Sequence, residues 1–128
     1  MKYRKMVRKL NYNGQISTKY NAKIVYDEVI SLKDLADEIS SKSSLNKSDV
    51  YSAVKALQEQ FIEHLANGNV LDLGELGRFK ASFKSKVCDD LKDVTTKTIT
   101  NWTVLYKPGK QIKEKLKNTT LELERSID

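Results

Sequence analysis

The chain reads LDLGELGRFKASFKSK from Leu71 to Lys86, and this stretch decides the fold. Residues 70–73 predict a short strand, and Gly74 and Gly77 predict a tight turn after it. From position 78 onward, apolar and basic residues alternate as they do along a strand with one face in the core. The apolar face carries Phe79, Ala81 and Phe83, and the opposite face carries Arg78, Lys80, Lys84 and Lys86.

This row of cations has two interpretations. Side chains two residues apart on a strand lie about 6.7 Å apart, so the row can follow a sugar–phosphate backbone. The same pattern is typical of an ordinary edge strand whose lysines discourage aggregation. The stretch by itself leaves both interpretations open.

The chain after this stretch predicts a strand, a turn and a helix. Residues 94–106 are rich in β-branched side chains and favour a strand. Lys107-Pro108-Gly109-Lys110 interrupts the pattern, and residues 111–124 then predict a helix. The loop between the two strands carries Asp89, Asp90 and Asp93 without the spacing of a calcium site, so we expect a solvated loop there.

Two helices are predicted before the decisive stretch. Ser31 followed by Asp34 is typical of a helix N-cap, and apolar residues then continue at helical spacing to the polar run 40–44. Asn46 begins a second helix of about 20 residues, near 30 Å long, that ends at Asn67-Gly68. Its apolar arc is wider than one neighbour needs, which is consistent with a second contact such as another subunit. We interpret His64 in this helix as a surface or interface residue.

The first 26 residues predict a basic β-hairpin. Residues 16–26 alternate as a half-buried strand does, residues 3–10 form a rougher candidate strand, and Asn13-Gly14 between them is a turn signal. The alternative is a disordered basic arm. Alternation over eleven residues favours the hairpin.

Charge is segregated along the chain. Residues 1–26 carry +7, residues 27–75 carry −6, residues 76–118 carry +7 and residues 119–128 carry −2, for a net charge of +6. Lysines make up 19 of the 23 cations, and lysine suits phosphate better than the edges of bases. The composition therefore favours an anionic partner, and contact with a DNA backbone over base reading. A solvated lysine-rich surface is the alternative.

Composition also excludes several classes. One Cys, one His and the lack of a recognisable catalytic or phosphate-binding motif argue against a disulfide framework, an ordinary zinc site and an enzyme. The chain shows no secretory segment and no run of 18 apolar residues. With 128 residues, we expect one intracellular, soluble domain without cofactor, metal site, membrane contact or small-molecule substrate.

Two motifs, at residues 71–80 and 104–110, together resemble the HU and integration-host-factor family of bacterial histone-like DNA-binding proteins. Residues 71–80 are similar to the family's glycine signature, with Glu75 in place of one glycine, and residues 104–110 are similar to its closing aromatic-x-proline-glycine-lysine motif. The resemblance covers residues 31–117. The extra segment before it resembles an extended variant of the Bacteroides group, in which an N-terminal strand pair joins the sheet.

The resemblance implies an α+β fold, with N-terminal helices, a sheet with a protruding β-arm, and a C-terminal helix. It implies one domain over 1–128: an extension at 1–30, the family core at 31–117 and a tail at 118–128. It also implies an intertwined homodimer that binds double-stranded DNA through sheet and arms, in the cytoplasm and associated with the nucleoid. Phosphate contacts carried over from the motifs are Lys80, Lys84, Lys107, Lys110 and Lys113.

Further candidate DNA contacts are predicted from the sequence pattern and not from the resemblance. Alternation adds Arg78 and Lys86, and the basic hairpin adds Lys2, Arg4, Lys5, Arg8 and Lys9. The arm departs from the family, because residues 85–101 have zero net charge and no proline to wedge between base pairs. We therefore expect the hairpin to compensate for the arm in architectural, largely non-specific DNA binding. The alternative is a protein-interaction or structural module with weak or no DNA binding.

Overall fold

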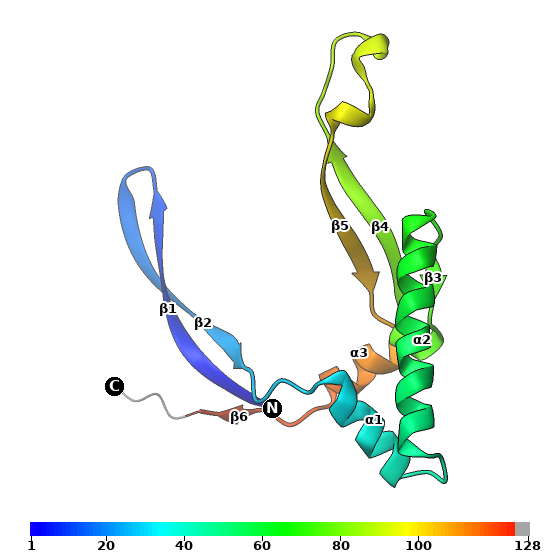
Figure 1. Cartoon of the computed structure of the whole chain (residues 1–128). Coiled ribbons are helices and arrows are strands. Elements are labelled where there is room, and N and C mark those ends of the chain that lie inside the picture. The colour runs from blue at the N-terminus through cyan, green and yellow to red at the C-terminus, as the bar shows by residue number, and fades with distance from the viewer. Residues whose placement is uncertain (125–128) are drawn as a thin grey trace. The chain divides into compact units, whose positions relative to one another are not determined.

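The computed structural model describes residues 1–124 as two compact units (Figure 1). One unit joins residues 1–29 to the segment that begins at Leu116, and the other spans residues 30–115. The elements, in chain order, are β1 (Lys2–Tyr12), β2 (Gln15–Val25), α1 (Leu32–Ser41), α2 (Lys47–Ala66), β3 (Leu71–Asp72), β4 (Arg78–Ser85), β5 (Ile99–Lys107), α3 (Lys110–Lys117) and β6 (Glu122–Leu123). The predicted α+β class is confirmed.

The N-terminal hairpin is confirmed, and its turn explains its register. Asn13 and Gly14 have φ angles of 51° and 79°, which suit the two-residue turns that match the twist of a hairpin. The turn pairs Tyr12 with Gln15, and the ladder then runs without a break to Lys2 and Val25.

The expectation that this strand pair joins the main sheet is wrong. It forms a separate sheet in the order β2-β1-β6, in which β6 runs parallel to β1. The Glu122 and Glu124 amides donate hydrogen bonds of 2.9 and 2.8 Å to the Met1 and Tyr3 carbonyls. The hairpin is also more exposed than a half-buried strand, because two strands alone offer neither face a covering layer.

Both N-terminal helices begin at the predicted caps. The Ser31 hydroxyl accepts a hydrogen bond from the Asp34 amide at 3.1 Å, and the Asp34 carboxylate accepts one from the Ser31 amide at 3.0 Å. These bonds stabilise the charged carboxylate and lower the pKa of Asp34. Asn46 caps α2 through the Ser48 amide at 2.9 Å, and α2 ends before Gly68 at a φ of 80°.

The two glycine motifs interlock. Gly77, at a φ of 109°, lies so close to the 107–109 turn that a Cβ there would overlap the Lys107 carbonyl oxygen and stand 2.9 Å from the Gly109 nitrogen. A Cβ on Gly109 would overlap the Glu75 carbonyl oxygen in turn. The Tyr106 hydroxyl donates a 2.7 Å hydrogen bond to the Leu76 carbonyl. Only glycine fits both positions, so the start of β4 and the end of β5 are held together.

Two predicted element boundaries are wrong. Residues 94–98 do not form a strand, and β5 begins only at Ile99. The Thr95 side chain accepts a bond from the Lys97 amide, and its carbonyl accepts one from the Thr98 hydroxyl, so local turns replace the ladder. The predicted helix over 111–124 ends at Lys117, because Asn118-Thr119-Thr120 favours helix poorly and the chain then pairs with β1.

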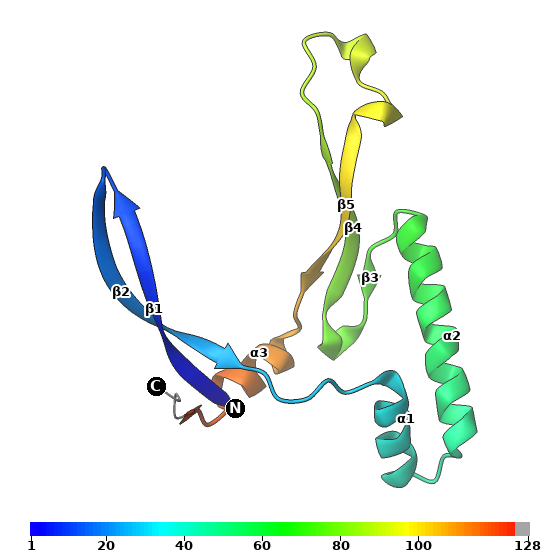
Figure 2. The same cartoon turned by 60° about the vertical axis from the view of Figure 1, so that its left-hand side comes forward.

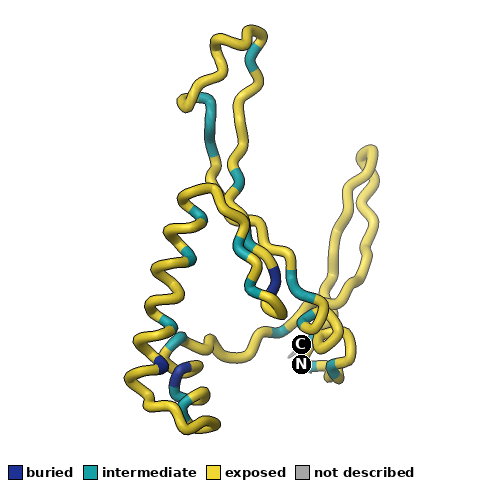
Figure 3. Tube along the Cα trace, turned by 90° about the vertical axis from the view of Figure 1, so that its right-hand side faces the viewer, coloured by how far each residue is buried: buried dark blue, intermediate teal, exposed yellow. Residues whose placement is uncertain are grey.

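Very little of the chain is buried (Figure 3). In residues 1–124 the buried hydrophobic side chains are Ala36 and Val50, at 1% and 6% exposure, where α1 meets α2. The chain exposes 11675 Å² of surface, whereas a folded monomer of 14.6 kDa exposes about 6,900 Å². The fold therefore leaves an unusually large apolar surface exposed. Within the same residues, no helix is long and apolar enough to cross a membrane.

Replacing Gly77 with alanine tests the interlock. We expect G77A to lower the free energy of unfolding by about 3 kcal/mol or more, because it adds a backbone overlap to an unfavourable φ. G68A is the matched control: its φ of 80° is also positive, but nothing lies within 4 Å of a Cβ there. It should cost about 1–2 kcal/mol. Equal losses in chemical denaturation would contradict the interlock.

Candidate nucleic-acid interface

The β4–β5 ribbon has one cationic and one aromatic face. Its antiparallel register sets Arg78 opposite Lys107 and Phe79 opposite Tyr106. The Phe79 and Tyr106 rings stack at 4.6 Å, and Phe79 meets Phe61 of α2 edge-to-face at 5.0 Å. The aromatic face therefore packs toward α2, and the cationic face points to the other side. The predicted alternation over β4 is confirmed.

A β-bulge divides the cationic face. The register shifts between Ser82 and Lys84, opposite Asn101, whose φ of 55° is left-handed. The extra residue lies in β5, and such a bulge bends and twists the strand that carries it. Lys84 pairs with Thr100, and Lys86, just past the end of β4, donates its amide to the Thr98 carbonyl at 2.9 Å.

The candidate cations differ in their acidic partners. Arg78 lies 3.2 Å from the Asp72 carboxylate, and Lys110 lies 3.9 Å from Glu114 one helical turn along α3. Of the seven candidates in or beside β4, β5 and α3, five form no ion pair with any described residue: Lys80, Lys84, Lys86, Lys107 and Lys113. These five keep their whole charge for an external anion.

Two lysines lie near the amino end of α3. Lys110 is its first residue, and the Lys113 amide bonds to the Gly109 carbonyl at 3.3 Å. The helix dipole disfavours cations at this end. The ion pair with Glu114 offsets this effect for Lys110, whereas Lys113 forms no ion pair with any described residue.

The structure adds two hydroxyls to the candidate interface and divides the predicted hairpin cations between two faces. Ser82 pairs with Thr103 on the cationic face, where both hydroxyls can donate to phosphate oxygens. In the hairpin, the register separates Lys2, Arg4 and Arg8 from Lys5 and Lys9, which lie on the opposite face. It also brings Lys19 and Lys23 to the side of Arg4 and Arg8. The two-residue turn at Asn13-Gly14 is the signal that carries this information.

The arm tip at the far end of the ribbon is neutral and partly apolar (Figures 1 and 2). Lys92 lies 3.7 Å from Asp90, and two of the most exposed apolar side chains of the described chain are here, Val87 at 98% and Leu91 at 89%. Cys88 is a free thiol. In residues 1–124, no group of three His, Cys, Asp or Glu side chains is placed to hold a metal ion.

Comparison with known proteins identifies the family. The model of the HU-HIG family, described as an HU domain fused to a wHTH, Ig or glycine-rich motif, matches residues 1–125. The chain belongs to the HU-HIG family. The predicted resemblance to HU-type proteins is therefore confirmed, and the HU-HIG match extends over the N-terminal hairpin.

A curated relative and a solved structure are also similar to this chain. The chain is 33% identical over 93 residues to the DNA-binding protein HU of Thermus thermophilus, across 70% of this chain and 95% of that protein. A crystal structure of a candidate bacterial DNA-binding protein from Bacteroides vulgatus shares the fold, with a TM-score of 0.65 at 18% identity. That match covers 95% of this chain but 47% of the Bacteroides chain, so this chain spans about half its length.

Proposed function

We propose that this HU-HIG chain binds double-stranded DNA as an architectural protein with little sequence preference. The observation that carries the proposal is the cationic face of the β4–β5 ribbon, with Lys80, Lys84 and Lys107 free of acidic partners in the described chain. Such a face neutralises phosphates and releases the counterions condensed on DNA. Flanking contacts would come from Arg78, Lys86, Lys110 and Lys113.

The prevalence of lysine supports backbone contact over base reading. Lysine is a flexible point charge, whereas specific contacts to guanine use the bidentate fork of arginine. Arg78 is the one arginine of this face, and Asp72 already engages its guanidinium at 3.2 Å. Little on the ribbon is therefore suited to reading a sequence.

A homodimer is the second part of the proposal. Leu57 and Ile62 on α2 are 52% and 65% exposed, and the chain buries too little apolar surface to form a full core. A second copy that covers these helices would complete the core. It would also double the number of phosphate contacts. In such a dimer we take the hairpin and the family core to act as one domain, located at the nucleoid.

An interaction module is the second candidate function. The neutral arm with exposed Val87 and Leu91 favours it, because apolar side chains with balanced charge suit a protein surface better than phosphate. Loss of duplex binding on ribbon variants would favour the first function. A chain that never binds duplex at low salt would favour the second.

Neutralising two ribbon lysines tests the DNA interface. We expect K80Q/K84Q to weaken duplex binding about 100-fold per dimer and to reduce the slope of log affinity against log salt by about 3 to 4, because four phosphate contacts are lost. Fluorescence anisotropy over a salt series measures both quantities.

The matched control is K33Q/K42Q, which removes the same charge from exposed positions of α1 and its C-cap. It should change the slope by less than about 1. Equal effects of the two variants would mean that net charge, and not the ribbon face, governs binding.

A charge on α2 tests the dimer. We expect I62E to raise the dimer dissociation constant about 100-fold, because a buried unpaired carboxylate costs several kcal/mol. Light scattering coupled to size-exclusion chromatography measures the change. S52E puts the same charge on an exposed polar position of α2 and should leave the dimer intact. A dimer unaffected by I62E would contradict an interface through this part of α2.

A further inference from the structure

The β1–β2 hairpin concentrates its cations on one face. Residues directly opposite in an antiparallel pair share a face, and the register sets Arg4 opposite Lys23 and Arg8 opposite Lys19. With Lys2 at the base, these residues form what we call the hairpin cationic face: Lys2, Arg4, Arg8, Lys19 and Lys23. The other face is mainly apolar, with Tyr3, Val7, Ile16, Tyr20 and Ile24 beside Lys5 and Lys9.

Two like-charge pairs on one ladder are unfavourable for folding. Cations directly opposite on neighbouring strands repel each other, and the two pairs lie only four residues apart, about 13 Å along the strand. Residues 1–26 contain no acid, and among the described residues the ion pair of Arg4 with Glu124 offsets one of the two pairs. This repulsion between cations lowers the stability of the hairpin, and a bound polyanion would reduce it.

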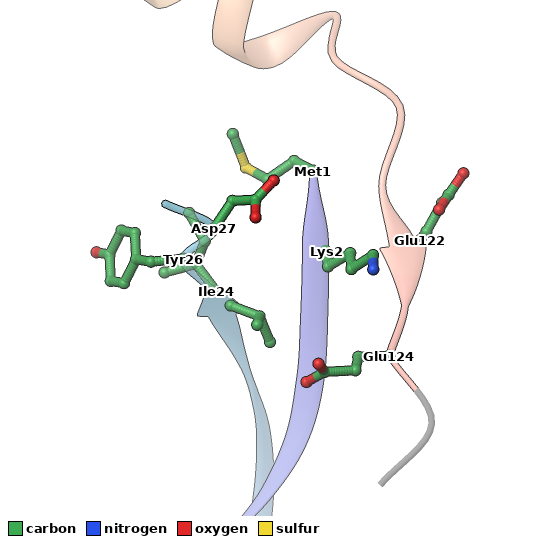
Figure 4. A pocket seen from close by; sticks show the side chains of 8 residues that line it. Met1, Lys2, Ile24, Tyr26, Asp27, Glu122 and Glu124 are labelled. Atoms are coloured by element: carbon green, nitrogen blue, oxygen red, sulfur yellow. The ribbon is translucent and has the colours of Figure 1, made fainter. Parts of the chain in front are cut away.

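The C-terminal strand neutralises one end of this face. The Glu124 carboxylate lies 3.4 Å from the Arg4 guanidinium, and in Figure 4 its side chain extends across β1 while Lys2 reaches toward β6. Farther along the ladder, Arg8, Lys19 and Lys23 form no ion pair with any described residue. The Arg8–Lys19 pair is thus the most available part of the face.

We propose that the hairpin cationic face is a second DNA-binding surface, which contacts the sugar–phosphate backbone independently of the β4–β5 ribbon. This rests on the proposed DNA binding and assigns Lys19 and Lys23 to it in place of Lys5 and Lys9. From Lys2 to Arg8 the face extends about 20 Å, a length of duplex axis that carries about 12 phosphates. An extended row of cations on a ribbon matches such a line of charge.

Two double variants of the full-length protein separate the hairpin faces. R8Q/K19Q removes the free pair, and K5Q/K9Q removes the same charge from the opposite face. With random duplex DNA, we expect R8Q/K19Q to lower affinity about tenfold and to reduce the salt slope by about 2 per hairpin. K5Q/K9Q should change affinity less than about twofold. Loss of a repulsive pair should leave the melting temperature of R8Q/K19Q at or above the parent value, so unfolding does not explain weaker binding.

The outcomes distinguish this proposal from the one on which it depends. A parent protein that fails to bind duplex overturns the proposed function. A parent that binds, loses affinity in K80Q/K84Q and keeps it in R8Q/K19Q overturns only the hairpin surface. Equal losses of duplex affinity in R8Q/K19Q and K5Q/K9Q also overturn it, because binding would then not depend on the face of the hairpin that carries the cations. Tighter binding to phosphatidylglycerol vesicles than to duplex, sensitive to R8Q/K19Q, would assign the face to membranes and overturn its role in DNA binding.

Removing the Glu124 carboxylate, one residue past the end of β6, should give the opposite change. E124Q frees Arg4, so duplex affinity should rise about threefold, within the range expected for one exposed ion pair. The same substitution in an R4Q background should have no effect. If E124Q binds duplex no more tightly than the parent protein, Arg4 is not part of the DNA-binding surface.

Discussion

The mutual approach of Gly77 and Gly109 holds together the part of the molecule that carries the β4–β5 ribbon. The turn before β4 lies directly against the turn after β5, so neither glycine position has room for a Cβ. The Tyr106 hydroxyl closes the same junction on the Leu76 carbonyl. This contact sets the register in which Arg78 faces Lys107, and it begins α3 at Lys110. The position of most candidate phosphate contacts therefore follows from one backbone contact.

The distribution of apolar surface explains why the family core is insufficient alone. The aromatic face of the ribbon contacts α2 through Phe61 and Phe79, yet much of α2 and the ribbon stays exposed. In the proposed homodimer, folding and association would be coupled, because a second copy would complete the core.

Local signals in the sequence predicted most of the fold. Ser31 with Asp34, Asn46, and the Asn13-Gly14 turn each act within a few residues, so their helices and hairpin could be predicted well. Local hydrogen bonds that compete with strand pairing were harder to predict. Thr95 accepts bonds from Lys97 and Thr98, so residues 95–98 form turns although their β-branched side chains favour a strand. The pairing of β6 with β1 joins chain ends through only two residues and leaves no pattern to read.

In the candidate site too, local patterns could be predicted from the sequence, whereas contacts between strands could not. Alternation along β4 placed Arg78, Lys80 and Lys84 on one face without knowledge of the partner strand. The hairpin cations needed the cross-strand register, because charge counting alone does not separate Lys5 from Arg4 or find Lys19. The bulge at Asn101 and the ion pair between Arg78 and Asp72 also depend on contacts that one strand does not reveal.

The lysine-rich faces, the neutral arm and the single arginine of the ribbon face support the proposal that this protein binds DNA mainly through its charge. The most direct test of that claim is the salt dependence of binding between the unmodified protein and a random duplex. With six to eight phosphate contacts per dimer, log affinity should fall against log salt with a slope of about −5 to −7. A slope near zero, or binding that one duplex sequence dominates at every salt concentration, would contradict it.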